Sequence, residues 1–459
     1  MVLSTIGYPP EQLGGTEVYV AALAEGLAAA GHTPTVVVLR PGGLGSPRER
    51  REQRGGVVLS RLEVPPEWLA AGPLARDDAI RGRLADTLET ACLRASPDIV
   101  HLHPLTIRVE AELARRLRGR GIPVVLTYHT PTVSCGRGDL LRRGRVECDG
   151  RLDVRRCGAC CLQARGAPAP LATAVAGLPG AILRALIRLP LPRRARSLLG
   201  VPLQVAALER DWRVLIENTE RVVAGSEWVV RLLALNRVAS ERIALIPHPV
   251  PHSIGPRAAA PTGPLRLGFV GRLRREKGAE VLLAALQGLP EDLVLSCEIA
   301  SPTLASPEPE DRRVQAAWEA IARRDPRVRL IGLLDPSAVQ ERIGGWDALL
   351  VPSLFPETGP LVVLEALAAG VPVIGSRRGG IAERVTEGLT GFLVAPGRAD
   401  ELTELITKLA REPERARALR GRGPLPPDAA ELTGRTVELY QVARARCLGG
   451  DACSTAPTS

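Results

Sequence analysis

Two glutamates separated by seven residues stand where a loop meets a predicted helix. Glu357 belongs to the segment Phe355-Pro-Glu-Thr-Gly-Pro-Leu, and Glu365 follows within the apolar run that continues it. Because a carboxylate on an apolar helix face is costly when it has no partner, Glu365 needs a hydroxyl or a cation beside it. A glutamate held in a structural salt bridge is the alternative. The backbone at the start of the same helix is suited to an anion, and it comprises Gly359, Pro360 and Leu361.

Two cations follow an earlier predicted strand of the same half of the chain. Arg272 comes just after the strand Leu265–Val270, and Lys277 lies five residues later beside Gly278. Lys277 is one of two lysines among 60 basic residues, so a compact ammonium is retained where the chain otherwise uses arginine. Such a pair could hold the two charges of a diphosphate. A solvated basic loop is the alternative.

The first part of the chain contributes a glycine-rich loop and a histidine. Gly14-Gly15-Thr16 opens a predicted helix, and His129 follows the predicted strand Val124–Tyr128. The carboxyl edge of a parallel strand is where α/β sheets bind ligands, so we interpret His129 as an active-site residue. A purely structural hydrogen bond is the alternative. Two further histidines on a strand end, which we interpret as mainly structural, are His101 and His103.

Five of the nine cysteines form a cluster that begins six residues after His129. In a reducing compartment such clustering favours a metal over disulfides. A Cys-x-x-Cys pair with two earlier cysteines is sufficient for a closed tetrahedral site, which predicts one structural zinc ion. An iron–sulfur cluster is an alternative, and coincidental free thiols are another. With Cys161 as a neighbour only, the predicted ligands are Cys135, Cys148, Cys157 and Cys160.

A segment rich in arginine and aliphatic residues follows the cysteines. Residues 179–199 combine five arginines with several leucines and isoleucines. An apolar face edged by arginines is suited to an anionic lipid surface, and it could equally cover its own domain. The sequence therefore leaves two interpretations open: a peripheral contact with the inner face of a membrane, and internal packing.

These residues need alternating strands and helices to position them. Short β-branched runs separated by helical patterns recur on both sides of a proline-rich joint. Apolar strands of this kind are typical of parallel sheets covered on both faces. We therefore predict an α/β chain with two facing, doubly wound, Rossmann-like domains and a cleft between them. The predicted divisions are an N-terminal domain over 1–250 with an insertion over 131–200, a linker over 251–264, a C-terminal domain over 265–425, and a helix with a disordered tail over 426–459.

The strands that this pattern predicts fall into two groups of six. Those of the first domain are Val2–Ile6, Thr35–Leu39, Asp98–Leu102, Val124–Tyr128, Arg221–Ala224 and Ile243–Ile246. Those of the second are Leu265–Val270, Leu293–Ile299, Val328–Ile331, Ala348–Val351, Pro372–Ile374 and Gly391–Val394.

The composition narrows the class of protein. The 459 residues carry a net charge of +10 and only 3% aromatic residues. A positive charge favours acidic partners such as phosphates, nucleic acid or anionic lipid, but so few aromatics argue against a nucleic-acid surface built on base stacking. Because the first residues lack a basic secretory signal and the longest uncharged stretch is broken by prolines, we expect a cytoplasmic protein.

The glutamate pair, the Arg272/Lys277 pair and the Gly14-Gly15 loop resemble the corresponding motifs of the retaining glycosyltransferases of family 4, which have the GT-B fold. The matching elements run from about Gly14 to Lys408. The resemblance implies that Glu365 holds the ribose hydroxyls of a nucleotide and that Glu357 contacts hydroxyls of the transferred sugar. It also implies that Arg272 and Lys277 neutralise the leaving diphosphate, that His129 is an active-site residue and that no catalytic divalent metal takes part. The cysteine insertion departs from the core of that family.

The expected activity is transfer of a sugar, a hexose by type, from a UDP- or GDP-sugar to an acceptor with retention of configuration. A sugar, a glycolipid or a small molecule would fit as acceptor, in the synthesis of envelope polysaccharide, glycolipid or a natural-product glycoside. One alternative is a zinc-containing nucleic-acid-binding protein, favoured by the positive charge and the cysteines. A sugar-binding pseudoenzyme is the other, and the intact motifs argue against it. The base and the sugar of the donor cannot be read from the residues.

Overall fold

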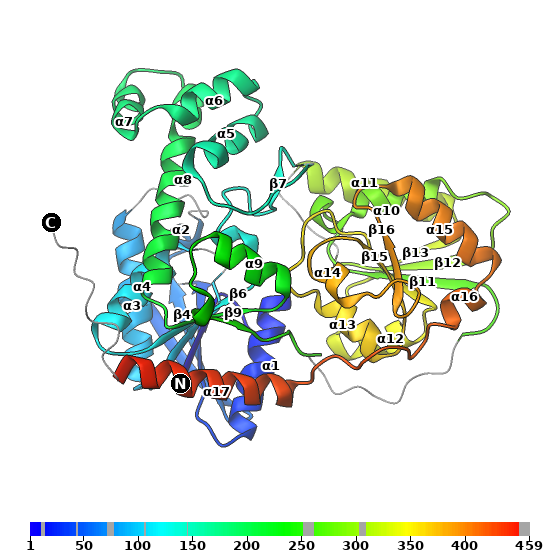
Figure 1. The fold of residues 1–459 in the computed structure, drawn as a ribbon, viewed down its shortest axis with the longest axis horizontal. Helices are drawn as coiled ribbons and strands as arrows, with labels where there is room; N and C mark the ends of the chain where they lie inside the picture. Colours follow the sequence, from blue (N-terminus) through cyan, green and yellow to red (C-terminus); the bar gives the residue numbers. More distant parts are fainter. Residues whose placement is uncertain are drawn as a thin grey trace. The chain divides into compact units, whose positions relative to one another are not determined.

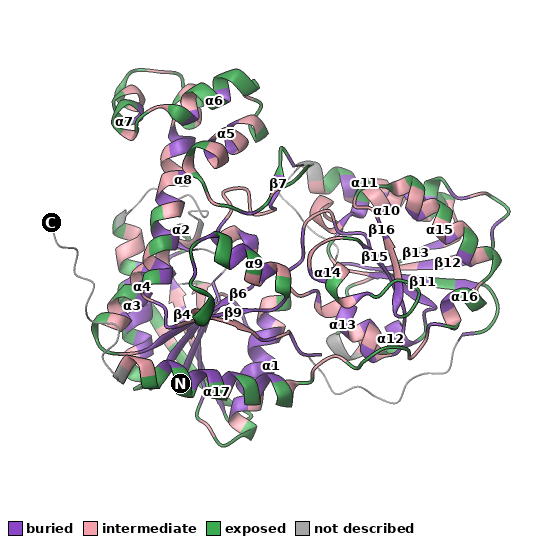
Figure 2. Cartoon of the chain, viewed as in Figure 1, coloured by how far each residue is buried: buried purple, intermediate pink, exposed green. Residues whose placement is uncertain are grey.

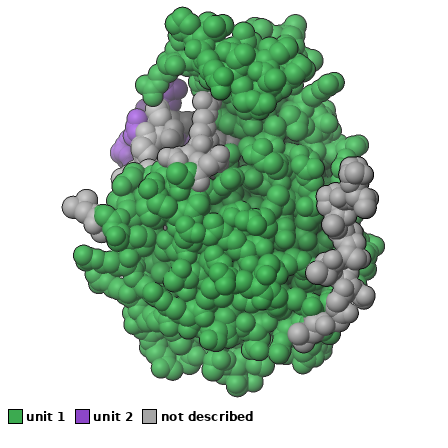
Figure 3. All heavy atoms as spheres, turned by 90° about the vertical axis from the view of Figure 1, so that its left-hand side faces the viewer, with its two compact units in different colours: residues 1–247, 430–459 green, residues 248–429 purple. Residues whose placement is uncertain are grey.

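The computed structural model describes residues 1–10, 14–42, 45–70, 78–104, 107–144, 146–250, 261–302 and 309–448 (Figure 1). The chain forms two compact units. Unit 1 combines Met1–Pro247 with Ala430–Ser459, and unit 2 is His248–Ala429 (Figure 3).

Unit 1 is built on an eight-stranded sheet in the order β10-β9-β6-β5-β1-β2-β4-β3. All neighbouring strands are parallel except β3, which pairs with β4 in an antiparallel hairpin at one edge. The strands are β1 (Val2–Thr5), β2 (Thr35–Pro41), β3 (Arg48–Arg54), β4 (Val57–Val64), β5 (Val100–Leu102), β6 (Val124–Tyr128), β9 (Arg221–Ala224) and β10 (Ile243–Leu245).

Helices cover both faces of this sheet because its strands are apolar on both sides. Successive strand residues point to opposite faces, so Val2 packs into one buried cluster and Leu3 into another. The cluster around Val2 takes in α3 (Asp78–Arg94), α4 (Arg108–Gly119), α8 (Arg193–Glu217) and α9 (Glu227–Leu235). The cluster around Leu3 takes in α1 (Gly15–Ala29) and α17 (Ala429–Leu448).

The segment predicted as an insertion, 131–200, forms a small helical subdomain on unit 1. Within this segment, the short hairpin of β7 (Leu141–Arg142) and β8 (Val146–Glu147) comes before the helices. Its helices are α5 (Val154–Ala164), α6 (Ala169–Gly177), α7 (Gly180–Arg188) and the first part of α8. The remaining short elements of unit 1 are α2 (Pro66–Ala70), η1 (Pro131–Val133) and η2 (Ser240–Arg242).

Unit 2 is a six-stranded, all-parallel sheet in the order β13-β12-β11-β14-β15-β16. Its strands are β11 (Leu265–Val270), β12 (Leu295–Ala300), β13 (Val328–Gly332), β14 (Ala348–Val351), β15 (Val373–Ser376) and β16 (Gly391–Val394). Two buried clusters again lie on opposite faces, and in β14 Leu350 belongs to one while Leu349 belongs to the other. The helices are η3 (Arg275–Lys277), α10 (Ala279–Gln287), α11 (Pro309–Arg324), α12 (Pro336–Gly344), α13 (Leu361–Ala368), α14 (Gly379–Arg384), α15 (Ala399–Arg411) and α16 (Glu414–Arg417).

These sheets confirm the predicted α/β class and the doubly wound, Rossmann-like architecture of each unit. Each of the twelve predicted strands overlaps an observed one. The hairpin of β3 and β4 was not predicted. The reason is that β3 reads Arg-Glu-Arg-Arg-Glu-Gln-Arg, so it has no apolar face for a pattern to detect.

The limits of the units differ from the predicted domains at the C-terminus. The segment 426–459 was expected to stand apart, but its helix α17 packs on unit 1 through Leu432, Leu439, Tyr440 and Ala443. The division between the units falls after Pro247 rather than after residue 250. Most of the predicted linker, 251–260, and the predicted tail, 449–459, lie outside the described residues.

In the part of the chain that the structure describes, no single helix is long and apolar enough to cross a membrane. The helices α6 and α7 are long and apolar enough only when taken together, and they are bent by 106° at their junction.

Candidate functional site

An ion pair between Lys277 and Glu357 forms the centre of the candidate site in unit 2. The Nζ atom of Lys277 donates to both carboxylate oxygens of Glu357, at 2.8 Å and 2.9 Å. The hydroxyl of Ser353 donates to one of the same oxygens at 2.6 Å. Glu357 is buried and Lys277 is half-buried beside the ring of Phe355. The carboxylate is therefore held in one orientation by groups from two separate loops.

Backbone contacts fix these two loops against each other. Lys277 ends the turn η3 after β11, and Glu357 lies in the loop after β14. The amide of Leu354 in the second loop donates to the carbonyl of Glu276 in the first at 2.9 Å. The loops thus meet through main-chain atoms, which do not depend on the side chains that do the chemistry.

Two glycines allow this close approach. Gly278 has φ +75°, and a Cβ on it would lie 1.9 Å from the carbonyl oxygen of Pro352. Gly380 donates its amide to the carbonyl of Glu357 at 2.7 Å, and a Cβ there would lie 2.8 Å from that oxygen. Neither position has room for a side chain, so the loops depend on glycine at both.

Glu365 lies in the second turn of α13 and is half-buried. Among the described residues, its carboxylate has no hydrogen-bond or ion-pair partner. Burial raises the pKa of Glu365 to about 7. A carboxylate that is desolvated without a partner is unfavourable, so Glu365 is suited to accept hydrogen bonds from a ligand rather than to hold the fold together.

The start of α13 offers backbone donors. Val363 and Leu364 both donate to the carbonyl of Pro360, whereas the amides of Leu361 and Val362 donate to no described backbone acceptor. Gly359 packs so closely on the buried His248 that a Cβ would lie 2.0 Å from its Nδ1 atom. Burial, followed by the charge of Arg384, lowers the pKa of His248 to about 4, so this ring is neutral at pH 7. Sequence reasoning missed His248, which belongs to unit 2 although it precedes the predicted C-terminal domain, 265–425.

Arg272 is exposed just beyond the end of β11. In residues 261–302 and 309–448 no hydrogen bond or ion pair joins its guanidinium, or the carboxylate of Glu365, to the Lys277–Glu357 pair. The structure therefore brings Lys277 and Glu357 into direct contact, whereas the side chains of Arg272 and Glu365 form no hydrogen bond or ion pair with a described residue.

In unit 1, His129 is paired with a second histidine. The Nε2 atom of His129 lies 2.9 Å from the Nδ1 atom of His103, and both rings are buried. The ring of Tyr19, from the second turn of α1, meets His129 edge-on at a centroid distance of 4.8 Å. Because one nitrogen of the pair must donate and the other accept, the tautomer of His129 is coupled to that of His103.

His101 has a structural environment, as its sequence position indicated. It forms hydrogen bonds of 2.7 Å with Thr127 and with Tyr440 of α17. Burial, followed by the charge of His129, lowers the pKa of His101 to about 3. His101 is therefore neutral at pH 7 and ties the last helix of the chain to the sheet beside the histidine pair.

We predict that His103 positions His129. Replacing His103 with leucine removes the hydrogen-bond partner and should lower turnover roughly tenfold to 100-fold, the scale for a misplaced catalytic group. The pH dependence of turnover should shift as well, because the tautomer of His129 is no longer fixed. His103→Asn, whose amide can replace Nδ1, should recover part of the activity.

The matched control is His101→Leu, which removes an equally buried ring that does not contact His129 through a hydrogen bond. Unfolding temperatures of all three variants separate loss of fold from loss of positioning. A pH profile of His103→Leu identical to that of the original chain would contradict the prediction.

The predicted glycine loop begins helix α1. Gly14 caps the helix, and a Cβ on Gly14 would lie 2.3 Å from a carboxylate oxygen of Glu17, which is buried over the helix start. Gly15 is exposed and Thr16 is half-buried. The residues directly before Gly14, 11–13, lie outside the described residues.

The cysteines of the cluster lie close together. In the described part of the chain, no group of three or more His, Cys, Asp or Glu side chains is arranged to hold a metal ion. Burial, together with the nearby Cys135 and Cys148, raises the pKa of Cys157 to about 11. Cys157 donates its thiol to the carbonyl of Arg151 at 3.8 Å. Cys157 is thus half-buried near two other thiols, and its own thiol is protonated at pH 7.

Cys160 and Cys161 have different surroundings on α5. Cys157 and Cys161 are four residues apart on α5 and share a face, and the Sγ atom of Cys161 would lie 3.1 Å from a Cβ on Gly136. Cys160 instead lines a hollow with the arginines of α5 and of the hairpin β7–β8. Burial raises the pKa of Cys161, and Cys135, Cys160 and Cys157 do so as well, so Cys161 also lies near the predicted ligands.

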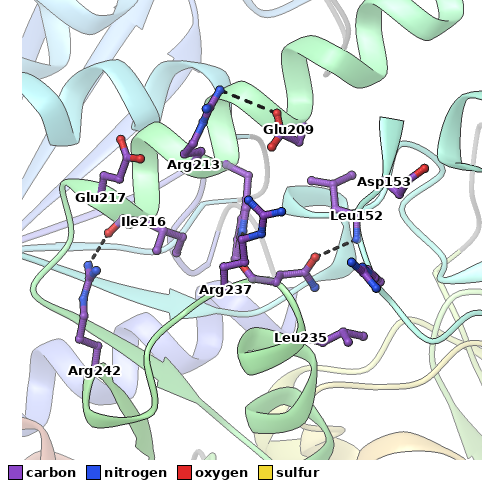
Figure 4. A pocket seen from close by; sticks show the side chains of 12 residues that line it. Leu152, Asp153, Glu209, Arg213, Ile216, Glu217, Leu235, Arg237 and Arg242 are labelled. Atoms are coloured by element: carbon purple, nitrogen blue, oxygen red, sulfur yellow. Dashed lines mark hydrogen bonds and ion pairs between the residues drawn. The ribbon is translucent and has the colours of Figure 1, made fainter. Parts of the chain in front are cut away.

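A separate cavity of about 290 Å³ lies between α8, α9 and the segment Arg151–Asp153 (Figure 4). Asn236 occupies its wall, accepts from the amide of Leu152 at 2.8 Å, and donates to the carbonyls of Gly150 and Leu232. The ring of Trp212 donates to the carbonyl of Asn236. These hydrogen bonds join the cysteine-bearing loop to the rest of unit 1. None of the predicted site residues lines this cavity.

Two family models match the chain. The model of the glycosyl transferase 4-like domain covers residues 14–159, and the model of glycosyl transferases group 1 covers residues 255–424. Among curated proteins, the D-inositol 3-phosphate glycosyltransferase of Arthrobacter sp. is 24% identical over 430 residues, which are 89% of this chain and 86% of that protein. The glycogen synthase of Mycobacterium tuberculosis is 33% identical over 191 residues, 40% of this chain and 44% of that protein. For several curated relatives, this one included, the matched part is less than half of their length.

Solved structures share the fold along almost the whole chain. The Anabaena protein HepE in complex with UDP and glucose has a TM-score of 0.59 at 15% identity, covering 96% of this chain and 99% of that one. Sucrose-phosphate synthase from Thermosynechococcus elongatus has a TM-score of 0.59 at 20% identity, covering 98% and 96%. At these identities the likeness concerns the fold alone.

The fold and the two family models together place the chain among the glycosyltransferases of the GT-B class. Both family models belong to one family, and their matched residues include the loop at Gly14, the Arg272/Lys277 pair and both glutamates. The chain belongs to glycosyltransferase family 4.

Proposed function

We propose that this chain transfers a hexose from a UDP- or GDP-sugar to its acceptor with retention of configuration. The observation that carries the proposal is Glu365, a half-buried carboxylate that has no described protein partner and a pKa of about 7. A ribose has two neighbouring hydroxyls that can donate hydrogen bonds to such a carboxylate. HepE, a structural neighbour, is known in complex with UDP and glucose, which supports a uridine nucleotide as one of the two candidates.

Retention is supported by the position of Glu357. Its two oxygens accept from Lys277, and one also accepts from Ser353. A carboxylate bound in this way is suited to orient sugar hydroxyls and poorly suited to attack the sugar. The proposed route is therefore attack by the acceptor on the face from which the diphosphate departs, with no glutamate acting as a nucleophile.

Lys277 and Arg272 would stabilise the charge that develops on the departing diphosphate. Preorganised cations act most strongly where charge appears in the transition state. The amides of Leu361 and Val362, at the positive end of α13, would add donors for the same phosphates. In this proposal no divalent metal has a catalytic role.

A thermal-unfolding screen tests the proposed donor. Stabilisation by a ligand grows with its concentration relative to its dissociation constant, so a panel of UDP-, GDP- and ADP-sugars should contain one clear best stabiliser. We expect a UDP- or GDP-sugar in that place. An ADP-sugar as the only stabiliser would overturn the choice of base, and no stabilisation by any of them would overturn the donor site.

The acceptor would be a sugar, a glycolipid or another small molecule held by unit 1, with His129 beside it. We place the reaction in the cytoplasm, with the segment 179–199 resting on the inner face of a membrane. The alternative of a nucleic-acid-binding protein is not supported by any of the relatives named above.

The cysteine cluster would hold one structural zinc ion, with an iron–sulfur cluster as the alternative. The support is the proximity of Cys135, Cys148, Cys157 and Cys161 in a loop that has few apolar residues. Because zinc binds thiolates, and burial raises the pKa of Cys148, Cys157 and Cys161, binding would order the loop and release protons. Four thiolates fill a tetrahedral ion and leave no open position for chemistry.

Elemental analysis of anaerobically purified protein tests this site. We expect about one zinc per chain. Cys161→Ser should then lower the zinc content, whereas Cys160→Ser, the matched control on the same helix, should not. Brown protein with iron and sulfide would favour the cluster. Metal-free protein with all five thiols open to titration would contradict both.

A further inference from the structure

The helices α6 and α7 form a projection of unit 1 together with the first turn of α8 (Figure 1). This projection, residues 169–196, lies outside the segments matched by both family models. It is firmly packed on its inner side, where Ala172, Ala176 and Leu183 are buried. Its outer side is largely exposed (Figure 2). The projection is thus an ordered structure with one free face.

Large aliphatic side chains occupy that free face. Leu171 on α6 is 54% exposed, Ile182 on α7 is 46% exposed, and Leu189 directly after α7 is 49% exposed. A single exposed aliphatic residue is ordinary, but three within one short projection indicate an interaction site. The two helices together also have the length and apolar composition of a membrane segment, although their 106° bend excludes a straight span. This combination is typical of helices that lie along a membrane surface.

The charge of the projection is of one sign. From Val154 to Leu208 the sequence has eight arginines and no aspartate or glutamate. Five of these arginines are exposed and form no hydrogen bond or ion pair with any described residue: Arg184, Arg188, Arg193, Arg194 and Arg196. Elsewhere in unit 1 arginines are commonly paired, as Arg115 and Arg116 are with Glu112. The face is therefore complementary to a negatively charged partner.

A basic hollow borders the projection. It lies between the hairpin β7–β8 and α5, and Thr173 and Gly177 of α6 close one side of it. Its volume is about 680 Å³, and four arginines line it: Arg142, Arg143, Arg155 and Arg156. Arg156 is paired with Asp149, and Arg143 with Gln163, so the hollow is already braced by protein contacts. Its size and charge suit a phosphate-bearing headgroup.

We propose that residues 169–196 dock unit 1 onto a bilayer of anionic lipid. Leu171, Ile182 and Leu189 would enter the boundary between headgroups and acyl chains, and the five free arginines would bind lipid phosphates. The proposal extends the proposed function in one respect: it gives the membrane contact a lipid chemistry and a set of residues.

Other occupants fit this face less well. The stretch from Val154 to Leu208 has no Phe, Trp or Tyr, so it cannot stack nucleic-acid bases. A second copy would bring five unpaired arginines against the same five, which is repulsive in a symmetric dimer. An anionic bilayer offers both a negative surface and an apolar layer beneath it.

Co-sedimentation with vesicles tests the proposal on the full chain. The probes are vesicles of phosphatidylcholine alone and of phosphatidylcholine with about one-third phosphatidylglycerol. We expect binding to the anionic vesicles only, and loss of most of that binding when salt is raised from about 0.1 M to 1 M.

Two variants divide the charge from the apolar contact. Replacing the five free arginines with glutamine should weaken partitioning at least about 100-fold, given the contribution of each basic residue near an anionic surface. Replacing Leu171, Ile182 and Leu189 with serine should weaken partitioning about tenfold or more and remove the part of binding that survives high salt. The matched control changes five exposed arginines of unit 2 to glutamine and should bind as before: Arg313, Arg323, Arg324, Arg411 and Arg422.

The outcomes separate this proposal from the proposed function. Each variant is also measured for thermal stabilisation by the best nucleotide sugar, which should be unchanged. Equal vesicle binding by the arginine variant and its control would overturn the docking surface. It would also be overturned if the original chain were a dimer and the serine variant a monomer, or if the original chain bound RNA and not vesicles. If no nucleotide sugar stabilised the original chain against thermal unfolding, the result would contradict the donor site and leave the docking surface untouched.

Discussion

Replacing Lys277 with alanine is expected to lower turnover by about 100-fold or more, which corresponds to about 2.7 kcal/mol of transition-state stabilisation. The same loss is expected for Arg272→Ala. The physical reason is that both cations would meet charge that grows on the diphosphate as the sugar departs. Steady-state kinetics with the best donor measures the effect. The matched control is Lys408→Ala, because Lys408 is the other lysine of the chain and forms an exposed ion pair with Glu404 on α15.

The contact with Glu357 requires a further variant. Lys277→Ala removes the cation beside the buried Glu357 carboxylate, so part of the loss could come from a disturbed loop. The double variant with Glu357→Gln removes that charge and should recover unfolding temperature without recovering turnover. Lys277→Arg should recover turnover only in part, because a planar guanidinium does not replace a compact ammonium. Full activity in Lys277→Arg would show that lysine has no special role here.

Glu365 should affect stability and nucleotide binding in opposite directions. Its pKa is raised to about 7 in the folded chain, above the ordinary value of 4.5. Folding therefore becomes less favourable as pH rises from about 4.5 to 7, since the folded state resists ionisation of this group. Glu365→Gln should raise the unfolding temperature of the ligand-free protein at pH 8, and the gain should vanish near pH 4.

Nucleotide affinity should follow the opposite pattern. The ionised carboxylate is the better acceptor for ribose hydroxyls, so binding of the donor nucleotide should be weaker at pH 6 than at pH 8. Glu365→Ala should weaken binding by about tenfold or more, the scale of a lost hydrogen bond to a charged group. Glu357→Ala should instead lower turnover with little change in nucleotide binding, because sugar contacts orient the reacting carbon.

Calorimetric titration of the nucleotide at both pH values and thermal unfolding supply the measurements. Glu404→Gln, an exposed glutamate of α15, is the control and should change neither quantity. A destabilised Glu365→Gln with unchanged nucleotide affinity would identify Glu365 as a structural residue.

Apolar patterning was sufficient for most of the fold. The six strands of unit 2 could be predicted because each is a short run rich in apolar residues between helices, and β14 and β15 are buried along their whole length. The strand β3 could not be predicted, because an edge strand made of arginine, glutamate and glutamine has no apolar face. The return of α17 to unit 1 was also beyond the pattern, because Leu432, Leu439 and Tyr440 are ordinary helical residues whose partners, such as Tyr19, lie more than 400 residues away in sequence.

The site shows a similar division. Residue type and spacing drew attention to Lys277, Glu357 and Glu365, and the structure places the first two in contact. Their supporting contacts could not be predicted: His103 pairs with His129 across two strands, and His248 packs under Gly359 from another segment. Cys160 and Cys161 are adjacent in sequence, so only the phase of helix α5 separates the one facing Gly136 from the one facing the basic hollow.

The position of α17 has a consequence for synthesis on the ribosome. The chain emerges from its N-terminus, so β1, β2 and α1 are available long before the residues that complete their core. Leu432, Leu439, Tyr440 and Ala443 arrive only after the whole of unit 2 has been made. During translation unit 2 can close its own core first, while one apolar face of unit 1 stays uncovered. A nascent chain that stops before Ala430 should therefore expose this face to chaperones and proteases even though both sheets are already encoded in it.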